Sequence, residues 1–360
     1  MKKIFKFSAL FFILILTALA VFLIFITFSD YQPSSIEVLQ TRQQANEDDR
    51  LLGMCFSVID WNIGYAGLGK DMDFFYDGGK RVRDSRQSTE DNMLHITSFI
   101  KNNDSIDFWM IQEVDKKSKR SYGIDQVKEM EAAIPHFFTV FATNYLVPYV
   151  PVPLSEPMGQ VHAGMMTFSR FPSTESVRYA YPLIADWPDR LFLLDRCFIL
   201  NHYALTNGRE LCLINTHNSA YVFDSLLRVK ELQILKKVMI EEYQKGNYVI
   251  AGGDWNQNPP GYEPVGGYNG HRFVRSEVRM AADFLPDTWQ WIFDASAPTN
   301  RNNDQAYHKG VNGTTALDYY VVSPNIQLVE VKVIDLNFVH SDHNPIYLKF
   351  LLSDSVNANY

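Results

Sequence analysis

The pattern of apolar and polar residues divides the chain into two unequal parts. Residues 7–28 contain no charge, and 19 of these 22 residues are apolar. At about 1.5 Å per residue they form a helix of roughly 33 Å, long enough to cross a hydrocarbon core of about 30 Å. The segment has no polar face, which disfavours a helix buried in a soluble core. We therefore predict a membrane-spanning helix within residues 1–28.

The charges beside this segment predict its orientation. Three lysines lie in the first six residues, and Asp30 is the first charge after the apolar run. By the positive-inside rule the N-terminus is predicted to be cytoplasmic and the rest of the chain extracytoplasmic. The alternative is a signal peptide whose cleavage releases a secreted protein, and Ala18-Leu19-Ala20 has the small-x-small form of a cleavage site. The length of the run favours a retained single-pass anchor.

The remaining chain shows a polar stretch followed by short apolar runs. Residues 29–52 are rich in Gln, Asn, Asp and Glu, which is typical of a linker. Structure is expected from Gly53 onward, with strands at 54–59, 106–114, 137–141, 164–168, 190–203, 209–216, 248–251, 316–322, 328–334 and 345–352. Helices are predicted after Ser88, over 124–134, and over 224–243 with Asp224 as N-cap. The inner face of the last helix is predicted to carry Leu232, Leu235 and Met239.

The order of these elements predicts a fold class. Several strands are linked as hairpins with few helices between them, which favours an α+β fold or a layered sandwich over a regular βαβ series. Residues 53–352 are predicted to form one domain, followed by a tail at 353–360. Residues 259–313 are rich in Gly, Asn, Asp and Pro and are predicted to be an elaborated loop region.

Composition excludes some classes of protein. Of the 360 residues, 46% are hydrophobic and 21% are charged, which excludes a multi-span membrane protein and a disordered chain. The net charge of −8 excludes a generally basic nucleic-acid coat protein. It leaves room for a local basic site, and residues 80–86 and 116–120 are two basic clusters.

The three cysteines are predicted to be reduced. Cys197 and Cys212 lie on two apolar runs joined by Asn207-Gly208, which is a strong hairpin-turn signal. A two-residue turn there places Cys212 opposite Tyr203, so the two cysteines are out of register for a disulfide. We interpret both, and Cys55, as small core residues.

Polar residues interrupt apolar runs at five places. These are Asp60-Trp61-Asn62, Gln112-Glu113, Asn215-Thr216-His217, residues 252–256, and Asp318 with the downstream Ser341-Asp342-His343. A single Asn or Asp at a strand end is typically a turn residue. A carboxylate inside an apolar run, such as Glu113, instead needs a partner or a cation. Together these residues supply oxygen ligands for a hard divalent cation and imidazoles that carboxylates can orient.

Other chemistries lack their motifs in this sequence. There is no His-x-x-x-His or Cys-x-x-Cys spacing for zinc. There is also no Gly-x-x-x-x-Gly-Lys-Ser/Thr loop and no Gly-x-Ser-x-Gly elbow. A nucleotide-driven motor and an α/β-hydrolase are therefore disfavoured.

The order of six blocks resembles the endonuclease/exonuclease/phosphatase superfamily, which includes pancreatic-type DNases, apurinic endonucleases, neutral sphingomyelinases and inositol polyphosphate 5-phosphatases. The blocks are Trp61-Asn62, Gln112-Glu113, Asn215-Thr216-His217, Gly253-Asp254-Trp255-Asn256, Leu317-Asp318-Tyr319 and Ser341-Asp342-His343. The resemblance covers about residues 53–352. It implies a four-layer sandwich, with two mixed sheets face to face, helices outside and the site at one end of the sheets. Trp255 replaces the commoner Phe, and residues 259–313 fit no subfamily pattern.

The resemblance also implies a metal ion. Glu113 would be the main ligand of Mg²⁺ or Mn²⁺, helped by Asn62 and Asp342. Mg²⁺ takes few carboxylates and keeps several waters, which agrees with this small ligand set. Whether one or two ions bind is left open.

The implied chemistry is in-line attack of water on phosphorus. His343 and Asp318 would form a dyad in which the carboxylate orients the imidazole. Asp254 and Asn256 would position or activate the attacking water. His217 would donate to phosphate oxygens or stabilise the leaving group. The identity of the general base stays open.

The substrate is the least determined part of this prediction. The acidic charge and the predicted anchor favour a phospholipid headgroup or a small phosphodiester, with a phosphomonoester also open. The alternative is an extracytoplasmic nuclease for which DNA is only a substrate. A non-catalytic binding protein is disfavoured because all six blocks keep their chemical residues. Aromatic residues in 145–157 and at Trp187 are interpreted as ordinary packing rather than a lipid pocket, and a monomer is the default expectation.

Overall fold

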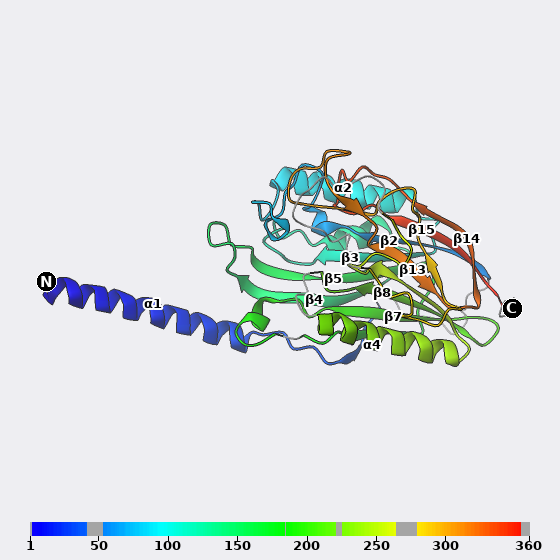
Figure 1. The fold of residues 1–360 in the computed structure, drawn as a ribbon, viewed down its shortest axis with the longest axis horizontal. Coiled ribbons are helices and arrows are strands. Elements are labelled where there is room, and N and C mark those ends of the chain that lie inside the picture. Colours follow the sequence, from blue (N-terminus) through cyan, green and yellow to red (C-terminus); the bar gives the residue numbers. More distant parts are fainter. Residues whose placement is uncertain (1, 42–52, 184, 221–224, 264–278, 354–360) are drawn as a thin grey trace.

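The computed structural model describes residues 2–41, 53–183, 185–220, 225–263 and 279–353. Two mixed β-sheets lie face to face, and helices cover their outer sides (Figure 1). Helices α2 (Arg86–Asn102) and α3 (Gln126–Ala133) pack on one sheet, and α4 (Ser225–Gln244) packs on the other. The predicted layered sandwich is confirmed.

Each sheet mixes parallel and antiparallel neighbours. The larger has the strand order β1 (Ile36–Val38), β6 (Glu175–Ala180), β7 (Cys197–Ala204), β8 (Glu210–His217), β9 (Tyr248–Asp254), β13 (Asp318–Val322) and β10 (Gln290–Ile292). The smaller has the order β14 (Ile326–Val333), β15 (Ile346–Leu352), β2 (Cys55–Asn62), β3 (Phe108–Asp115), β5 (Gly159–Ser169) and β4 (Phe138–Val150). A separate ladder joins β11 (Asn300–Arg301) and β12 (Thr314–Thr315). Short 3₁₀ turns are η1 (Gly64–Ala66), η2 (Phe75–Asp77) and η3 (Asp189–Phe192).

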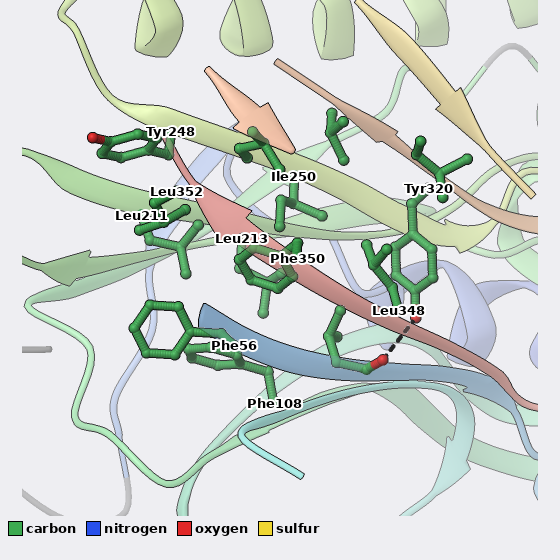
Figure 2. Packing of buried hydrophobic residues seen from close by; sticks show 14 of the residues in the cluster. Phe56, Phe108, Leu211, Leu213, Tyr248, Ile250, Tyr320, Leu348, Phe350 and Leu352 are labelled. Carbon is green, nitrogen blue, oxygen red and sulfur yellow. Dashed lines mark hydrogen bonds between the residues drawn. The ribbon is translucent and has the colours of Figure 1, made fainter. Parts of the chain in front are cut away.

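The main core lies between the two sheets (Figure 2). Alternate residues of each strand point inward, so the two inner faces interdigitate. Leu213 and Ile250 of the larger sheet are fully buried in this cluster together with Phe108 and Phe350 of the smaller one. The hydroxyl of Tyr320 crosses the core and donates to the backbone carbonyl of Ile346 at 2.8 Å. The sheets are thus fixed relative to one another.

Helix α2 begins earlier than the sequence prediction. Its N-cap is Ser85, whose hydroxyl accepts from the backbone N–H of Ser88 at 3.1 Å. The capping residue is therefore three positions before the predicted one, because Ser88 already lies within the first turn. Met93, Ile96 and Ile100, spaced three and four residues apart, form the buried face of α2.

The strand predicted over 190–203 is wrong in its first half. Residues Asp189–Phe192 form the turn η3, and β7 begins only at Cys197. Pro188 precedes the turn with a φ of −91°, and the proline ring favours such a turn over an extended strand. Strands β1 and β6 were not predicted from the sequence. The start of structure at Gly53 is also wrong, because Ile36–Val38 pairs with β6.

The β7–β8 hairpin differs from the predicted register by one residue. His202, not Tyr203, lies opposite Cys212. The connection spans residues 205–209, where the N–H of Leu205 donates to the carbonyl of Arg209 at 2.9 Å. The three cysteines are free, as predicted, but Cys55 is exposed at the start of β2 rather than in the core.

The two remaining long helices are α4 and α1. In α4, Leu235 and Met239 are buried and Leu232 packs against the same cluster, which confirms the predicted inner face; the predicted N-cap Asp224 lies outside the described residues. Helix α1 (Lys2–Phe28) is long and apolar enough to cross a membrane, and it projects away from the body (Figure 1).

Candidate active site

Strand pairing gathers the predicted site residues at one end of both sheets. Parallel pairing of β8 with β9 sets His217 beside Asp254, and antiparallel pairing of β9 with β13 sets Asp254 beside Asp318. In the other sheet, parallel pairing of β2 with β3 sets Asn62 beside Gln112. Because these strands end or begin at the same edge, their polar termini converge although they are far apart in the sequence.

Glu113 reaches the site through a β-bulge. Two residues of β3, Gln112 and Glu113, face the single residue Met165 of β5. Such a bulge re-aims a side chain that regular alternation would send to the opposite face. Glu113 has a φ of +55°, a conformation that is strained for a residue with a Cβ and that concentrates at functional sites.

Asp254 is the centre of the cluster. Its Oδ2 accepts from Nδ2 of Asn62 at 3.1 Å and lies 3.5 Å from Nε2 of His217 and 3.8 Å from Nε2 of His343. Its Oδ1 accepts from the backbone N–H of Asn256 at 2.9 Å. All of these side chains are nearly fully buried. One carboxylate therefore lies within reach of both predicted imidazoles.

Asn256 is held in a fixed orientation. Its φ of +51° follows the end of β9, and its Nδ2 donates to the carbonyl of Asn218 at 2.9 Å. The buried Oδ1 of Asn256 has no hydrogen-bond partner among the described residues. An orphaned acceptor in a polar site can accept from water or substrate.

Asp318 and His343 form the predicted dyad. Asp318 Oδ2 lies 2.7 Å from His343 Nδ1, and both side chains are buried. Burial alone would lower the pKa of His343, but the charges of Asp318, Asp342 and Asp254 outweigh it and raise this pKa to about 10. Burial raises the pKa of Asp318 to about 6, although His343 opposes the shift. The charge of each group thus favours the ionised form of the other, which gives a carboxylate–imidazolium pair.

Asn300 faces the other side of the imidazole. Its Nδ2 lies 2.9 Å from His343 Nε2, and its Oδ1 is buried without a hydrogen-bond partner among the described residues. The amide nitrogen suits a neutral imidazole, which accepts at Nε2, whereas an imidazolium needs the amide oxygen. The two protonation states of His343 thus require two orientations of the Asn300 amide.

Asp342 is held by the loop before it and by residue 303. Its Oδ2 accepts from Nδ2 of Asn303 at 2.6 Å. The hydroxyl of Ser341 donates to the carbonyl of Asn62 at 2.8 Å, and Nε1 of Trp61 donates to the carbonyl of His343 at 3.0 Å. These bonds tie the end of β2 to the segment that carries the dyad.

The residues predicted to hold the metal fit a hard cation. The pKa of Glu113 is raised by burial and by the nearby charge of Asp342, against the weaker effect of Arg120. A buried carboxylate beside a second carboxylate forms a site that a divalent cation stabilises. Asn62 directs Nδ2 to Oε1 of Glu113 at 3.1 Å, while its Oδ1 accepts from the N–H of Gly64 at 3.0 Å. That oxygen has a second lone pair for a cation.

A polar bridge underlies the site between the sheets. Nε2 of Gln112 donates to Oδ1 of Asp60 and to Oδ1 of Asn215, each at 2.7 Å. Burial, and then the charge of Asp318, raises the pKa of Asp60 well above its usual range. Asp60 thus belongs to the polar support of the site.

Sequence reasoning missed the contributions of Asn300 and Asn303. Both belong to the region that composition identifies only as loop, and β11 places Asn300 beside His343 through an isolated bridge. Arg301 between them is buried, and its guanidinium donates to the carbonyls of residues 68 and 69. The only sequence signal was the density of asparagine, which also marks ordinary turns.

The basic clusters contain fewer free charges than their sequence suggests. Arg120 is buried, pairs with Asp115 at 2.9 Å and stacks on the ring of Tyr65. Arg83 pairs with Glu156 at 2.7 Å. The exposed charges of residues 116–120 are Lys116, Lys117 and Lys119.

A second group of potential ligands lies away from the site, on the α4 side of the larger sheet. His202, Cys212 and Glu242 are buried together. Glu242 already pairs with Lys245 at 2.6 Å and accepts from Asn247 at 2.9 Å. Hydrogen bonds and this ion pair account for the group without a cation.

Comparisons with known proteins agree with this geometry. The family described as "Endonuclease/Exonuclease/phosphatase family" matches residues 61–343. No curated protein matches the chain. A solved endonuclease/exonuclease/phosphatase from Bacteroides vulgatus has 14% identity and a TM-score of 0.54, over 83% of this chain and 99% of that one.

Two further solved structures are similar in fold. The human Nocturnin catalytic domain with bound sulfate has 17% identity and a TM-score of 0.52, over 84% of this chain and 96% of that one. The TDP2 of D. rerio complexed with a single-strand DNA product has 14% identity and a TM-score of 0.51, over 82% and 98%. At such identities the likeness shows the shared fold.

Proposed function

Because the chain belongs to the endonuclease/exonuclease/phosphatase family, we propose that it is a membrane-anchored, Mg²⁺- or Mn²⁺-dependent phosphoesterase that hydrolyses a phosphodiester or phosphomonoester. The observation that carries this proposal is the cluster around Asp254. Five strand ends and one loop, separated by up to 281 positions between Asn62 and His343, deliver carboxylates, amides and imidazoles to one buried place. Titratable groups gathered in this way are typical of a catalytic site.

The proposed metal site consists of Glu113 with Asp342 and Asn62. A divalent cation bound there would supply positive charge to the phosphoryl oxygens during the reaction. The chain itself orients the substrate and the attacking water. Asp254 and the orphaned Oδ1 of Asn256 are the groups that would hold that water in line with phosphorus.

The two histidines would offset the negative charge that develops on the phosphoryl group. His343 is held at Nδ1 by Asp318, and a protonated Nε2 would donate to a phosphoryl oxygen in place of the Asn300 amide. Nε2 of His217 lies 3.5 Å from Asp254 and 3.9 Å from Glu113, in position to donate to an oxygen bound between them. The anchor would be α1, with the body on the extracytoplasmic side.

A phospholipid headgroup or a small phosphodiester is the proposed substrate. A nuclease tracks its backbone with a broad positive surface. Here the arginines of both basic clusters are largely paired with carboxylates, which disfavours such a track. DNA is the second candidate, because the similar TDP2 of D. rerio holds a DNA product.

A parallel substrate panel tests this function. The full chain, purified in detergent with Mg²⁺, is assayed on sphingomyelin, phosphoinositides, bis-p-nitrophenyl phosphate and plasmid DNA. We expect turnover of a lipid or small phosphoester that disappears in Glu113→Ala and His343→Ala. Inactivity on every substrate, with Mn²⁺ as well, contradicts the enzyme. Plasmid cleavage that both substitutions abolish, without lipid turnover, contradicts the substrate class.

A further inference from the structure

Helix α1 packs against the body at one defined place. Phe22 contacts the ring of Tyr149 at the end of β4, with ring centroids 6.0 Å apart, and stacks on Phe192 of η3 at 6.3 Å. Nε1 of Trp187 donates to the hydroxyl of Thr27 at 3.1 Å. The last two turns of a helix suited to a membrane are therefore in contact with the folded domain.

The segments that contact α1 also carry an exposed apolar rim. It consists of six side chains on the end of β4, the β4–β5 loop and the β6–β7 connection. Their exposed fractions are 39% for Tyr149, 39% for Val152, 88% for Leu154, 38% for Leu183, 54% for Trp187 and 42% for Leu193. In Figure 1 the β4–β5 loop projects on the side from which α1 leaves the body. Apolar side chains gathered in this way mark an interaction surface rather than ordinary packing.

The candidate active site lies at the same end of the sheets. β3 and β4 both pair antiparallel with β5, so their C-terminal ends point the same way. Gly164 pairs with both Val114 and Thr143, which places Glu113 near the level of Thr143. From Thr143 to Tyr149 the strand rises about 20 Å towards the rim, at about 3.3 Å per residue.

Helix α1 leaves the body at the end to which β4 leads (Figure 1). Phe22 contacts Tyr149, which lies about 20 Å of strand from the level of Glu113, and Phe22 precedes Phe28 by about 9 Å of helix. The headgroup layer of a bilayer is about 5–7 Å thick on each side. A bilayer crossed by α1 would therefore face the end of the domain that carries the site.

We propose that the apolar rim inserts into the bilayer interface beside α1 and holds the active site over the headgroups, so that the substrate is a phosphoester of a membrane lipid. The substrate part rests on the proposed phosphoesterase function, whereas the bilayer contact does not. Trp and Tyr side chains favour the membrane interface, and Leu154 at the loop tip would enter the acyl boundary.

The charges near the rim are compatible with binding to a bilayer, because two lysines lie where they would reach lipid phosphates. The backbone N–H groups of Lys116 and Lys119 donate to the carbonyls of His162 and Gln160 in β5. The segment that carries these lysines therefore runs along β5 from the site towards the β4–β5 loop. Their exposed ammonium groups would extend to lipid phosphates. The rim itself carries the exposed acids Asp186 and Asp189, so we expect insertion into zwitterionic phosphatidylcholine and no requirement for anionic lipid.

Fluorescence quenching tests the bilayer contact. The full chain carrying Cys55→Ser and Leu154→Cys is labelled with an environment-sensitive fluorophore and reconstituted in phosphatidylcholine nanodiscs with brominated acyl chains. The matched control is Val329→Cys, which is 51% exposed on β14 at the opposite edge of the sheet. We expect quenching of more than half of the emission at position 154 and little at 329. Equal emission at both positions, with α1 inserted, overturns the contact.

Turnover measurements test the lipid substrate. Leu154→Glu should lower hydrolysis of a vesicle-embedded sphingomyelin or phosphoinositide at least tenfold and leave bis-p-nitrophenyl phosphate hydrolysis unchanged, whereas Val329→Glu should change neither. If position 154 is quenched and bis-p-nitrophenyl phosphate is hydrolysed but no lipid is, the membrane-lipid substrate is overturned and the bilayer contact stands. Quenching without any phosphoesterase activity instead contradicts the proposed function while the contact stands.

Discussion

At the scale of single residues, the site depends on charge placed where water is excluded. Asp318 and His343 are both buried and 2.7 Å apart, so each sets the protonation of the other. Glu113 could be singled out from the sequence because a carboxylate in an apolar run is costly. Asn300 and Asn303 could not, because asparagine in a loop is common and their contacts with His343 and Asp342 are tertiary.

Asp318→Asn should disable the dyad by removing the charge of Asp318 without leaving a cavity. In Asp318→Asn, the pKa of His343 should fall from about 10 towards its ordinary range, because the nearest of its three carboxylates is neutralised. Phosphoester turnover at pH 7 should fall about 100-fold or more. NMR titration of the His343 ring and steady-state kinetics check this, and an unchanged pKa contradicts the role of Asp318.

The same shift predicts how stability depends on pH. The folded protein binds the His343 proton more tightly than the unfolded chain, whose histidine pKa is 6.5. The stabilisation is therefore complete below about pH 6.5 and is lost as the pH rises to about 10. Unfolding by urea, in EDTA, should show this loss in the wild type and a smaller loss in Asp318→Asn. Parallel curves for the two proteins speak against the shift.

At the scale of elements, bulges and close strand contacts decide where side chains point. Periodicity located the strands that carry the site, but it does not reveal a bulge such as that at Glu113 or a shift of one residue in the β7–β8 hairpin. Those features arise from pairing with strands distant in the sequence. The predicted helix start at Ser88 was displaced for a local reason, because Ser85 is an equally good cap.

Gly253 illustrates how tightly β8 and β9 approach. Its φ is +140°, and an added Cβ would lie 1.9 Å from the carbonyl oxygen of Thr216. Gly253→Ala should lower the free energy of unfolding by more than about 3 kcal/mol and abolish activity. Gly208→Ala is the control, because its φ is +80° but nothing lies within 4 Å, and it should cost only about 1–2 kcal/mol. Equal losses in urea unfolding would contradict this account.

At the scale of the whole molecule, a polar bridge joins the two sheets and the apolar helix α1 contacts the domain that they form. The four-layer sandwich with two mixed sheets followed from the family resemblance, whereas hairpin order alone left an α+β fold and a layered sandwich both open. The attachment of α1 beside the site-bearing end could not be foreseen, since it depends on tertiary contacts with β4 and η3. The boundaries of the domain and the retention of α1 remain predictions.

The bridge at Gln112 should couple the two sheets. Gln112→Leu leaves the buried groups of Asp60 and Asn215 without their donor, and should lower the free energy of unfolding by about 2–4 kcal/mol. Asp60→Asn should cost clearly less, because burial already favours a neutral side chain there. Urea unfolding of both variants gives the comparison, and an equal or reversed order excludes the proposed network.

The central claim is that Glu113 holds a cation that this site needs for phosphoester hydrolysis. The most direct measurement is a Mg²⁺ titration of bis-p-nitrophenyl phosphate turnover by the EDTA-stripped full chain and by Glu113→Gln. We predict saturable activation of the wild type, and at least about 100-fold lower turnover with weakened Mg²⁺ dependence in the variant. Equal turnover by the two proteins, or full activity in EDTA, would contradict the account.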